Sequence, residues 1–197
     1  MERKVTEALP NWFANDGQQN FENILLKNFQ GKSFKFLQVG AYSGDASLWL
    51  YENLLRKSDS ILVDVDTWEG SDEPAHKALN WDTVENLYDA RTRIAREQRK
   101  IIKVKLTSDY FFKNNREFYD FIYIDGDHTA YGVIKDAVNA FEVLKPGGII
   151  AFDDYDWRGG TGPIDRPRMA IDAFLEIYKE KIEVIHKQYQ CWVRKVA

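Results

Sequence analysis

Short apolar runs alternate with amphipathic stretches along most of this chain, and that alternation limits the possible folds more than any other feature. Five runs have the composition of strands: residues 34–39, 61–65, 101–106, 119–124 and 149–152. The stretches between them carry apolar residues at helical spacing. A chain in which strands and helices alternate predicts a mostly parallel sheet with helices on both faces.

Two further strands are predicted near the end of the chain, over residues 182–186 and 191–196. They lie too close in sequence for a crossover helix, so they should pair as an antiparallel hairpin at one edge of the sheet. We therefore expect an α/β protein with a Rossmann-like, doubly wound, seven-stranded sheet that is mostly parallel. The length of 197 residues suits one domain, and we expect residues 1–197 to form it.

Composition and charge exclude several classes of protein. The net charge is −4 and there is no run of Lys and Arg, which argues against a nucleic-acid partner. Cys191 is the only cysteine, so we expect no disulfide framework and a cytoplasmic location. The start, Met1-Glu2-Arg3-Lys4, is not followed by the apolar segment of a signal peptide. The longest apolar stretch, residues 147–152, is too short to span a bilayer, so we expect no membrane association.

Polar and glycine residues stand directly after each of the first five predicted strands. In chain order they are Gly40, Asp66, Ser108, Asp125 and Asp153. Parallel strands end at the same edge of a sheet, and ligands of such sheets bind beyond that edge, near the point where the strand order reverses. We therefore expect these residues to converge on one ligand site.

The first of these positions begins a glycine-rich turn, Gly40-Ala41-Tyr42-Ser43-Gly44, which leads into a helix predicted over residues 45–57. Glycines at such a turn let the backbone approach a ligand closely. The G-x-x-x-G spacing differs from the G-x-G-x-x-G of dinucleotide sites, so a nucleoside such as S-adenosylmethionine fits better. A tight turn without a ligand is the alternative.

An acid follows the second strand, where a carboxylate can accept hydrogen bonds from both hydroxyls of a ribose. Asp66 stands at the strand end and is the preferred residue. Asp64 is the second choice, because it points to the face opposite that of Val63 and Val65. The alternative for this acid is a solvated residue of the loop.

Three further acids follow neighbouring strands, namely Asp125, Asp153 and Asp154. Their carboxylates could form an oxygen site for Mg²⁺ or a similar ion, and without a cation they would repel one another. The alternative is that Asp153 or Asp154 caps the next segment.

His128 lies at the same rim, where an imidazole could act as a base near neutral pH. The alternative for His128 is a packed hydrogen-bond partner. The other two histidines, His76 and His186, are expected to be structural or exposed.

Taken together, these motifs resemble the class I S-adenosylmethionine-dependent methyltransferases, and among them the small-molecule O-methyltransferases related to macrocin O-methyltransferase. The resemblance extends from about Phe34 to Tyr178. Its segments are Gly40-x-x-x-Gly44, Val65-Asp66-Thr67-Trp68, Ile124-Asp125-Gly126-Asp127-His128-x-x-Tyr131, Leu144-Lys145-Pro146-Gly147-Gly148 and Phe152-Asp153-Asp154.

The resemblance implies S-adenosyl-L-methionine as cofactor, with a divalent ion such as Mg²⁺ in the metal-dependent branch. The implied cofactor contacts are Gln38, Gly40, Ala41, Tyr42, Gly44, Asp66, Thr67, Trp68, Ser108, Asp109 and Asp125. The implied metal ligands are Asp125, Asp153 and Asp154, and the implied base is His128 or Asp127. Gln38 departs from the family, which usually has an acid at that position.

Three hypotheses about function follow. The first is a divalent-metal-dependent methyltransferase acting on a hydroxyl of a small molecule. The second is a metal-independent methyltransferase of the same fold, in which the aspartates position the substrate. The third is a non-catalytic module that binds S-adenosylmethionine. The methyl acceptor cannot be read from the sequence, nor can the oligomeric state, for which a homodimer stays open.

Overall fold

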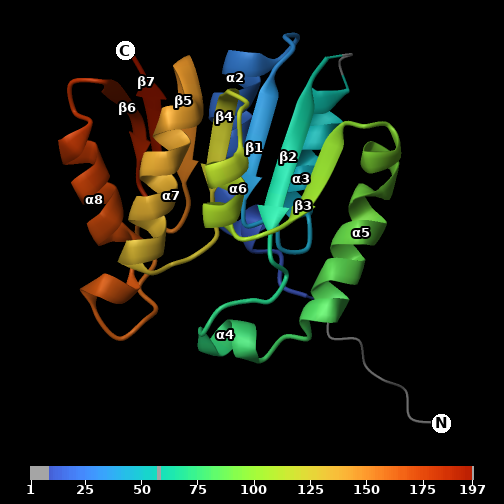
Figure 1. The fold of residues 1–197 in the computed structure, drawn as a ribbon, viewed down its shortest axis with the longest axis horizontal. Helices are drawn as coiled ribbons and strands as arrows, with labels where there is room; N and C mark the ends of the chain where they lie inside the picture. Colours follow the sequence, from blue (N-terminus) through green and yellow to red (C-terminus); the bar gives the residue numbers. More distant parts are fainter. Residues whose placement is uncertain (1–8, 57–58, 197) are drawn as a thin grey trace.

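A computed structural model describes residues 9–56 and 59–196 of the chain. Its centre is a seven-stranded sheet with the strand order β3-β2-β1-β4-β5-β7-β6 (Figure 1). The strands are β1 (Lys35–Val39), β2 (Ile61–Asp66), β3 (Ile101–Lys105), β4 (Tyr119–Ile124), β5 (Leu144–Phe152), β6 (Ile182–Lys187) and β7 (Cys191–Lys195). Strands β1 to β5 pair in parallel, and β7 pairs antiparallel with both β5 and β6. The predicted sheet is confirmed.

Helices cover both faces of this sheet. A continuous helical segment near the start comprises η1 (Phe13–Gly17), α1 (Gln18–Asn20), η2 (Phe21–Leu25) and α2 (Leu26–Phe29). The others are α3 (Asp45–Leu50) with η3 (Tyr51–Leu55), α4 (Pro74–Lys77), α5 (Trp81–Glu97), α6 (Ser108–Asn114), α7 (Ala130–Val143), η4 (Pro163–Asp165) and α8 (Pro167–Ile177). Among the described residues, no helix is both long and apolar enough to cross a membrane.

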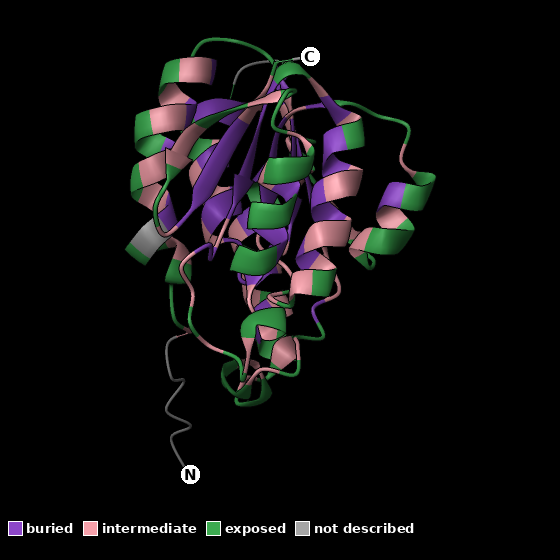
Figure 2. Ribbon diagram, turned by 90° about the vertical axis from the view of Figure 1, so that its left-hand side faces the viewer, coloured by how far each residue is buried: buried purple, intermediate pink, exposed green. Residues whose placement is uncertain are grey.

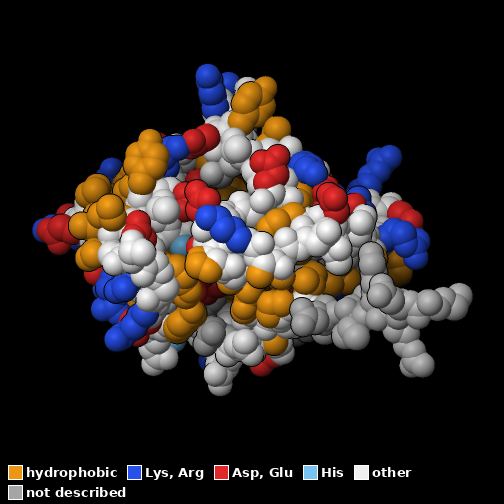
Figure 3. Space-filling view, turned by 90° about the horizontal axis from the view of Figure 1, so that it is seen from below, with side chains coloured by type: hydrophobic (Ala, Val, Ile, Leu, Met, Phe, Trp, Pro, Cys, Tyr) orange, Lys and Arg blue, Asp and Glu red, His pale blue; other side chains and the backbone are white. Residues whose placement is uncertain are grey.

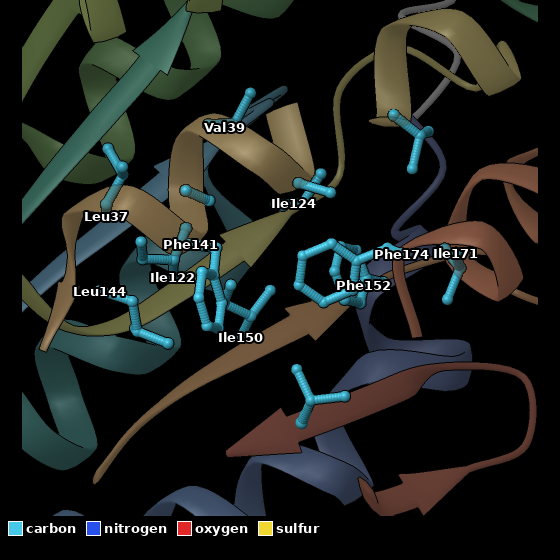
Figure 4. Close-up of a cluster of buried hydrophobic side chains, with 14 of the residues drawn as sticks. Leu37, Val39, Ile122, Ile124, Phe141, Leu144, Ile150, Phe152, Ile171 and Phe174 are labelled. Carbon is cyan, nitrogen blue, oxygen red and sulfur yellow. The ribbon is translucent and has the colours of Figure 1, made fainter. Parts of the chain in front are cut away.

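Alternation along the strands divides the apolar residues between two cores. On β1, Leu37 and Val39 face a cluster that includes Phe141 of α7 and Phe174 of α8 (Figure 4). Phe36, on the opposite face, packs in a second cluster with residues of the N-terminal helical segment and α3. Figure 2 shows the consequence, because the buried strands lie between two layers of helices whose outer surfaces are exposed.

Three local features differ from the sequence-based expectation. Helix α6 was not predicted, because its run Ser108–Asn114 is short and only Phe112 in it is buried. Strand β5 begins at Leu144, several residues before the predicted start, with a register shift where it pairs β4. The helix predicted over residues 45–57 is described as far as Leu55, and Lys57 lies outside the described residues.

The sheet topology identifies the edge at which a ligand is expected to bind. Strand order reverses between β1 and β4, which are neighbours, and the carboxyl ends of β1 to β5 all lie at the lower edge in Figure 1. The segment with α4, between β2 and β3 in sequence, lies beneath that edge. This arrangement creates the switch point at which ligands of doubly wound sheets bind.

Candidate functional site

The turn after β1 approaches the turn after β4 so closely that only glycine fits between them. Gly40 has φ +85°, and a Cβ built on it would lie 1.9 Å from the carbonyl oxygen of Asp125. Gly44 also has a positive φ, of +82°, and occupies the residue before the first turn of α3. The predicted glycine turn therefore joins the two central strand ends of the sheet.

Asp66 holds this turn in place. Its Oδ2 accepts hydrogen bonds from the backbone N–H of Ala41 at 2.7 Å and of Tyr42 at 2.9 Å. Its Oδ1 accepts one from the N–H of Trp68 at 2.7 Å. A carboxylate offers about four acceptor sites, and three of those on Asp66 are already used by the backbone. Most of the acceptor capacity of Asp66 therefore stabilises the loop, and little of it is left for the hydroxyls of a ribose.

Asp64, the second choice from sequence, has an acceptor to spare. It is fully buried, and its Oδ2 accepts a hydrogen bond of 2.7 Å from the hydroxyl of Tyr88. Among the described residues its Oδ1 makes no hydrogen bond of good geometry, although the Ser47 hydroxyl is near enough to lower the pKa of the carboxyl. Burial raises the pKa of this carboxyl to about 7. A buried oxygen without a partner is costly, so it indicates a missing donor such as a ligand hydroxyl.

Gln38 lies beside Asp64, because the two residues are register partners on β1 and β2. The Gln38 side-chain amide donates to the carbonyl of Gly40 at 2.9 Å, and its oxygen lies 3.4 Å from the hydroxyl of Ser47. The amide thus braces the glycine turn from within, whereas the oxygen has only one long contact.

Thr67 and Trp68 continue the chain after Asp66 and support the turn. Trp68 is buried with φ +51°, and its ring nitrogen donates to the carbonyl of Tyr42 at 2.8 Å. Its ring centroid lies 4.8 Å from that of Tyr88. Thr67 accepts a hydrogen bond from the N–H of Glu69. Trp68 is therefore part of the wall behind the turn.

Ser108 and Asp109, the predicted adenine neighbours, begin α6 at the end of β3. Asp109 forms an ion pair with Lys135 of α7. Burial raises the pKa of Asp136 to about 6, against the opposing effect of a hydrogen bond from Ser108. These contacts fix α6 against α7 beside the site.

Asp125, Asp153 and Asp154 meet in one acidic corner, as their positions after β4 and β5 predicted. Burial, with the charges of Asp153 and Asp154, raises the pKa of Asp125 well above its usual range. Burial and the charge of Asp154 raise the pKa of Asp153 to about 6. Like charges gathered in a buried site favour protonation or a cation.

The individual oxygens are arranged differently from the predicted set of ligands. Asp153 accepts hydrogen bonds from the hydroxyl of Tyr123 at 2.8 Å and from the amide of Gln190 at 2.7 Å. One ligand atom from each of Asp125, His128 and Asp154 lies within 4.8 Å of the others. His128, which the sequence placed at this rim as a candidate base, therefore also has an atom in position to act as a ligand.

His128 bridges two carboxylates that come from different strand ends. Its Nε2 lies 2.9 Å from Oδ2 of Asp154, and its Nδ1 lies 2.8 Å from Oε1 of Glu73. The approach to Glu73 is close but lacks the directed geometry of a hydrogen bond. Burial disfavours the charged ring, yet its contacts with Asp154 and Glu73 prevail and raise the pKa of His128 well above its ordinary value.

Asp127, the alternative base, is turned toward α7. Its Oδ1 accepts a hydrogen bond of 2.7 Å from the N–H of Thr129, and its carboxylate lies against Gly132. These contacts are those of a residue at a helix start, and they leave His128 as the basic group that faces the acids.

Aromatic and imidazole rings form a series of contacts that reaches His128, since the ring centroids of His76 and His128 lie 6.2 Å apart. Ring centroids lie 4.7 Å apart for Trp12 and Tyr42, 6.0 Å for Tyr42 and Trp81, and 5.2 Å for Trp81 and His76. On the other side, the ring of Trp157 lies 5.0 Å from that of His128. Figure 3, which views this edge of the molecule, shows apolar side chains gathered across the face and histidine only in small areas between them.

Several residues of this site were missed by sequence reasoning. Glu73, Tyr88 and Gln190 contact His128, Asp64 and Asp153 respectively, and each comes from a distant segment. No local motif marks them. Tyr88 lies in the sequence among apolar residues at helical spacing, and that spacing indicates burial rather than a partner.

The sequence of this chain is similar to those of known methyltransferases. A family model described as a methyltransferase domain matches residues 37–155, which is more than half of the chain. The chain is 28% identical over 151 residues to "Probable caffeoyl-CoA O-methyltransferase 3" of Dictyostelium discoideum. That match covers 76% of this chain and 55% of the relative, so the chain spans about half the length of the relative.

Solved structures share the fold at low sequence identity. An O-methyltransferase of Bacillus cereus in complex with S-adenosylhomocysteine (SAH) superposes with a TM-score of 0.59 at 17% identity, covering 83% of this chain and 74% of the other. The O-methyltransferase TomG of Streptomyces achromogenes, in complex with S-adenosylmethionine, gives 0.61 at 13%, covering 83% and 73%. A ribosomal protein L11 methylase of Lactobacillus delbrueckii gives 0.58 at 11%, covering 91% and 78%.

Proposed function

The chain belongs to the methyltransferase domain family, and from that premise we propose that it transfers the methyl group of S-adenosylmethionine to a hydroxyl of a small molecule, with the help of a divalent ion. The main support for this proposal is that the glycine turn after β1 contacts the acidic corner after β4 at the switch point of the sheet. Gly40 touches Asp125, so a cofactor laid along the turn would end beside the acids.

Binding of S-adenosylmethionine is supported by the two acids of β2 that lie behind the turn. Asp64 offers a buried oxygen without a partner to a donor such as a ribose hydroxyl. Asp66 stays the acid predicted from sequence, with one acceptor site left after its three backbone hydrogen bonds. The relatives in complex with S-adenosylmethionine or SAH are of the same fold.

The residues of the acidic corner fit a divalent cation. Asp125, Asp153 and Asp154 would supply carboxylate oxygens, which Mg²⁺ prefers. The hydrogen bonds from Tyr123 and Gln190 leave Asp153 further acceptor sites and would orient it, as outer partners of ligating carboxylates do. When bound, the ion would polarise the acceptor hydroxyl and make its proton easier to remove.

His128 is the residue that we propose to receive this proton. Against the effect of burial, its contacts with Asp154 and Glu73 raise its pKa well above the ordinary value, and a cation held by Asp154 would oppose that shift and favour the neutral ring. Its Nε2 faces the corner and its distance to Asp154 is 2.9 Å, whereas Asp127 is held at the start of α7. With the oxygen deprotonated, alignment of acceptor and cofactor provides most of what methyl transfer requires.

A small acceptor is supported by the form of the rim. Trp157, whose ring centroid lies 5.0 Å from that of His128, also lines a hollow of about 270 Å³ with Asp156, Arg158, Arg166 and Arg168. This volume is slightly below the usual range for ligand pockets, so it favours a small acceptor. Kinship to the macrocin branch, a cytoplasmic location and a homodimer remain predictions from the sequence.

The metal-independent alternative has one observation in its favour, namely that both oxygens of Asp153 already have donors. The experiment that separates the two is methyl transfer from labelled S-adenosylmethionine to a panel of catechols and other hydroxyl acceptors, with EDTA or with Mg²⁺. We expect transfer that EDTA abolishes and Mg²⁺ restores. Transfer that EDTA leaves unchanged would establish the metal-independent mechanism.

A further inference from the structure

The hollow beside Trp157 is basic, although the protein as a whole is acidic. Its lining residues are Asp156, Trp157, Arg158, Arg166 and Arg168. Three guanidinium groups therefore share the hollow with one carboxylate, whereas the whole chain has a net charge of −4. Arginines gathered around a concave site favour an anion, because their charges act on the same ligand and their N–H groups can bind it in pairs.

The one carboxylate of the hollow leaves Arg166 without a partner charge. Asp156 forms an ion pair with Arg168 and lies 3.9 Å from the Nη2 atom of Arg158. Arg166 uses its Nε–H to donate a hydrogen bond of 2.9 Å to the carbonyl of Gly159. Within residues 9–56 and 59–196, the Arg166 guanidinium forms no ion pair and its two terminal nitrogens make no hydrogen bond. The donors on those nitrogens are therefore available to a ligand.

The loop that carries these arginines is held in shape by contacts of its own. The backbone of Gly159 lies against the Trp157 ring, where a built Cβ would stand 2.0 Å from the ring carbon Cζ2. Asp165 turns its carboxylate into the loop and accepts a hydrogen bond of 3.1 Å from the N–H of Gly162. The bond from Arg166 to Gly159 then ties the two ends of the loop together. A site that is formed in advance loses less conformational freedom when a ligand binds.

The same loop reaches the acidic corner at two points. The ring centroid of Trp157 lies 5.0 Å from that of His128. Pro167, which stands between Arg166 and Arg168 in the sequence, lines the corner together with its three aspartates. In Figure 1 this loop, drawn in orange below α8, lies at the same edge as the strand ends. The basic hollow and the acidic corner are therefore neighbours, and one small molecule can contact both.

We propose that the hollow binds an anionic group of the acceptor, a carboxylate or a phosphate ester, and so makes the enzyme selective for hydroxylated acids. The inference rests on the proposed function for the reaction at the hydroxyl. The corner holds three carboxylates and the hollow an excess of guanidinium groups, so the two sites prefer opposite ends of such a molecule. The anion lies toward Arg166 and Arg158, which leaves the hydroxyl toward His128. Carboxylate and phosphate both match the planar fork of a guanidinium group.

The first test compares charged and neutral probes that differ in one group. The full chain, saturated with SAH, is titrated calorimetrically with benzoate, phenyl phosphate and benzamide. We expect at least one of the two anions to bind roughly tenfold or more tightly than benzamide, because charge-assisted hydrogen bonds to arginine are the stronger ones. The tighter of the two anions identifies the group that the hollow prefers.

Variants of the hollow should change anion binding in opposite directions. Arg166→Gln and Arg158→Gln should each weaken it several-fold, and Arg166→Lys should weaken it less than Arg166→Gln, since it keeps the charge but loses the fork. Asp156→Asn should strengthen it, because it removes the carboxylate that lines the hollow. The matched control is Arg93→Gln, the same change at an exposed arginine of α5, and it should leave anion binding unchanged.

The second test extends the comparison to catalysis. With 3,4-dihydroxybenzoate and 3,4-dihydroxybenzamide as acceptors, kcat/KM should favour the acid by about tenfold, and Arg166→Gln should remove that preference mainly through KM. Equal binding of the three probes, or anion binding that neither arginine variant weakens, would overturn the inference. Failure of the chain to bind SAH would refute the proposed function instead, and the same probe titrations without SAH would still decide whether the hollow binds anions.

Discussion

The α-carbon of Gly40 lies so close to Asp125 that a Cβ there would stand 1.9 Å from the Asp125 carbonyl oxygen. This approach joins the cofactor turn to the acidic corner. Real Cβ atoms do not come so near to backbone, so the two turns must separate if Gly40 gains a side chain.

Gly40→Ala should therefore destabilise the fold and abolish SAH binding. The matched control is Gly31→Ala, because Gly31 has φ +81° yet no atom within 4 Å of its built Cβ. The control should cost only the strain of a left-handed residue, about 1–2 kcal/mol. Denaturant unfolding and calorimetry check both variants. Equal losses of stability would mean that the clash with Asp125 is relieved cheaply and that the junction is not tight.

Asp64→Asn and Asp66→Ala should fail in different ways. Above pH 7, where the Asp64 carboxyl is ionised, removing its charge should weaken SAH binding by roughly tenfold or more, since a hydrogen bond to a charged group contributes about 1.5–3 kcal/mol. Asp66→Ala removes three backbone hydrogen bonds, so its main effect should be on unfolding. Calorimetry and denaturant unfolding separate the two. If only Asp66→Ala weakens SAH binding while stability is kept, the ribose is held by Asp66, as first predicted.

The stability of the protein should decrease as the pH is raised, because of Asp64. Burial raises the pKa of its carboxyl to about 7, from 3.8. Between these values the unfolded chain releases the proton and the folded chain retains it, so raising the pH favours unfolding. The stabilisation is complete below about pH 4 and is lost by about pH 7. Relative to Asp64→Asn, the wild type without cofactor should therefore lose unfolding free energy across this window. A difference that stays constant with pH would show that Asp64 is ionised throughout.

Loss of any acid of the corner should reduce metal binding, and loss of Asp153 or Asp154 should do so without loss of the cofactor. Asp125→Asn, Asp153→Asn and Asp154→Asn should each weaken Mg²⁺ binding at least several-fold, because each removes a charged oxygen from the ligand set. SAH affinity should stay nearly unchanged for Asp153→Asn and Asp154→Asn. Calorimetric titration with Mg²⁺ measures the effect. Unaltered Mg²⁺ binding in Asp153→Asn would leave the ion to Asp125, His128 and Asp154, whose atoms already converge.

The sequence was informative wherever a residue is placed by the strand that precedes it. Gly40, Asp66, Asp125 and Asp153 all lie at one edge because parallel strands end together, and short apolar runs identify those strands. The period of two along β2 also placed Asp64 and Asp66 on the face opposite that of Val63 and Val65. It could not decide between the two acids, since that choice depends on which donors the turn and α5 bring to each carboxylate.

The partners of the site were beyond sequence reasoning for a physical reason. Glu73 reaches His128 only because the segment after β2 folds back beneath the strand ends, and no local pattern encodes that return. Gln190 reaches Asp153 from the start of the final hairpin strand in the same way. Helix α6 was missed because a short helix with one buried residue has almost no periodic signal.

The central claim is that this edge of the sheet binds S-adenosylmethionine, and calorimetric titration of the whole chain with SAH, with NAD⁺ as the competitor ligand, tests it most directly. We predict saturable binding of one SAH per chain, weakened by Asp64→Asn, and no binding of NAD⁺, whose pyrophosphate the G-x-x-x-G turn is not spaced to hold. Binding of NAD⁺ in place of SAH, or no binding of SAH at all, would contradict it.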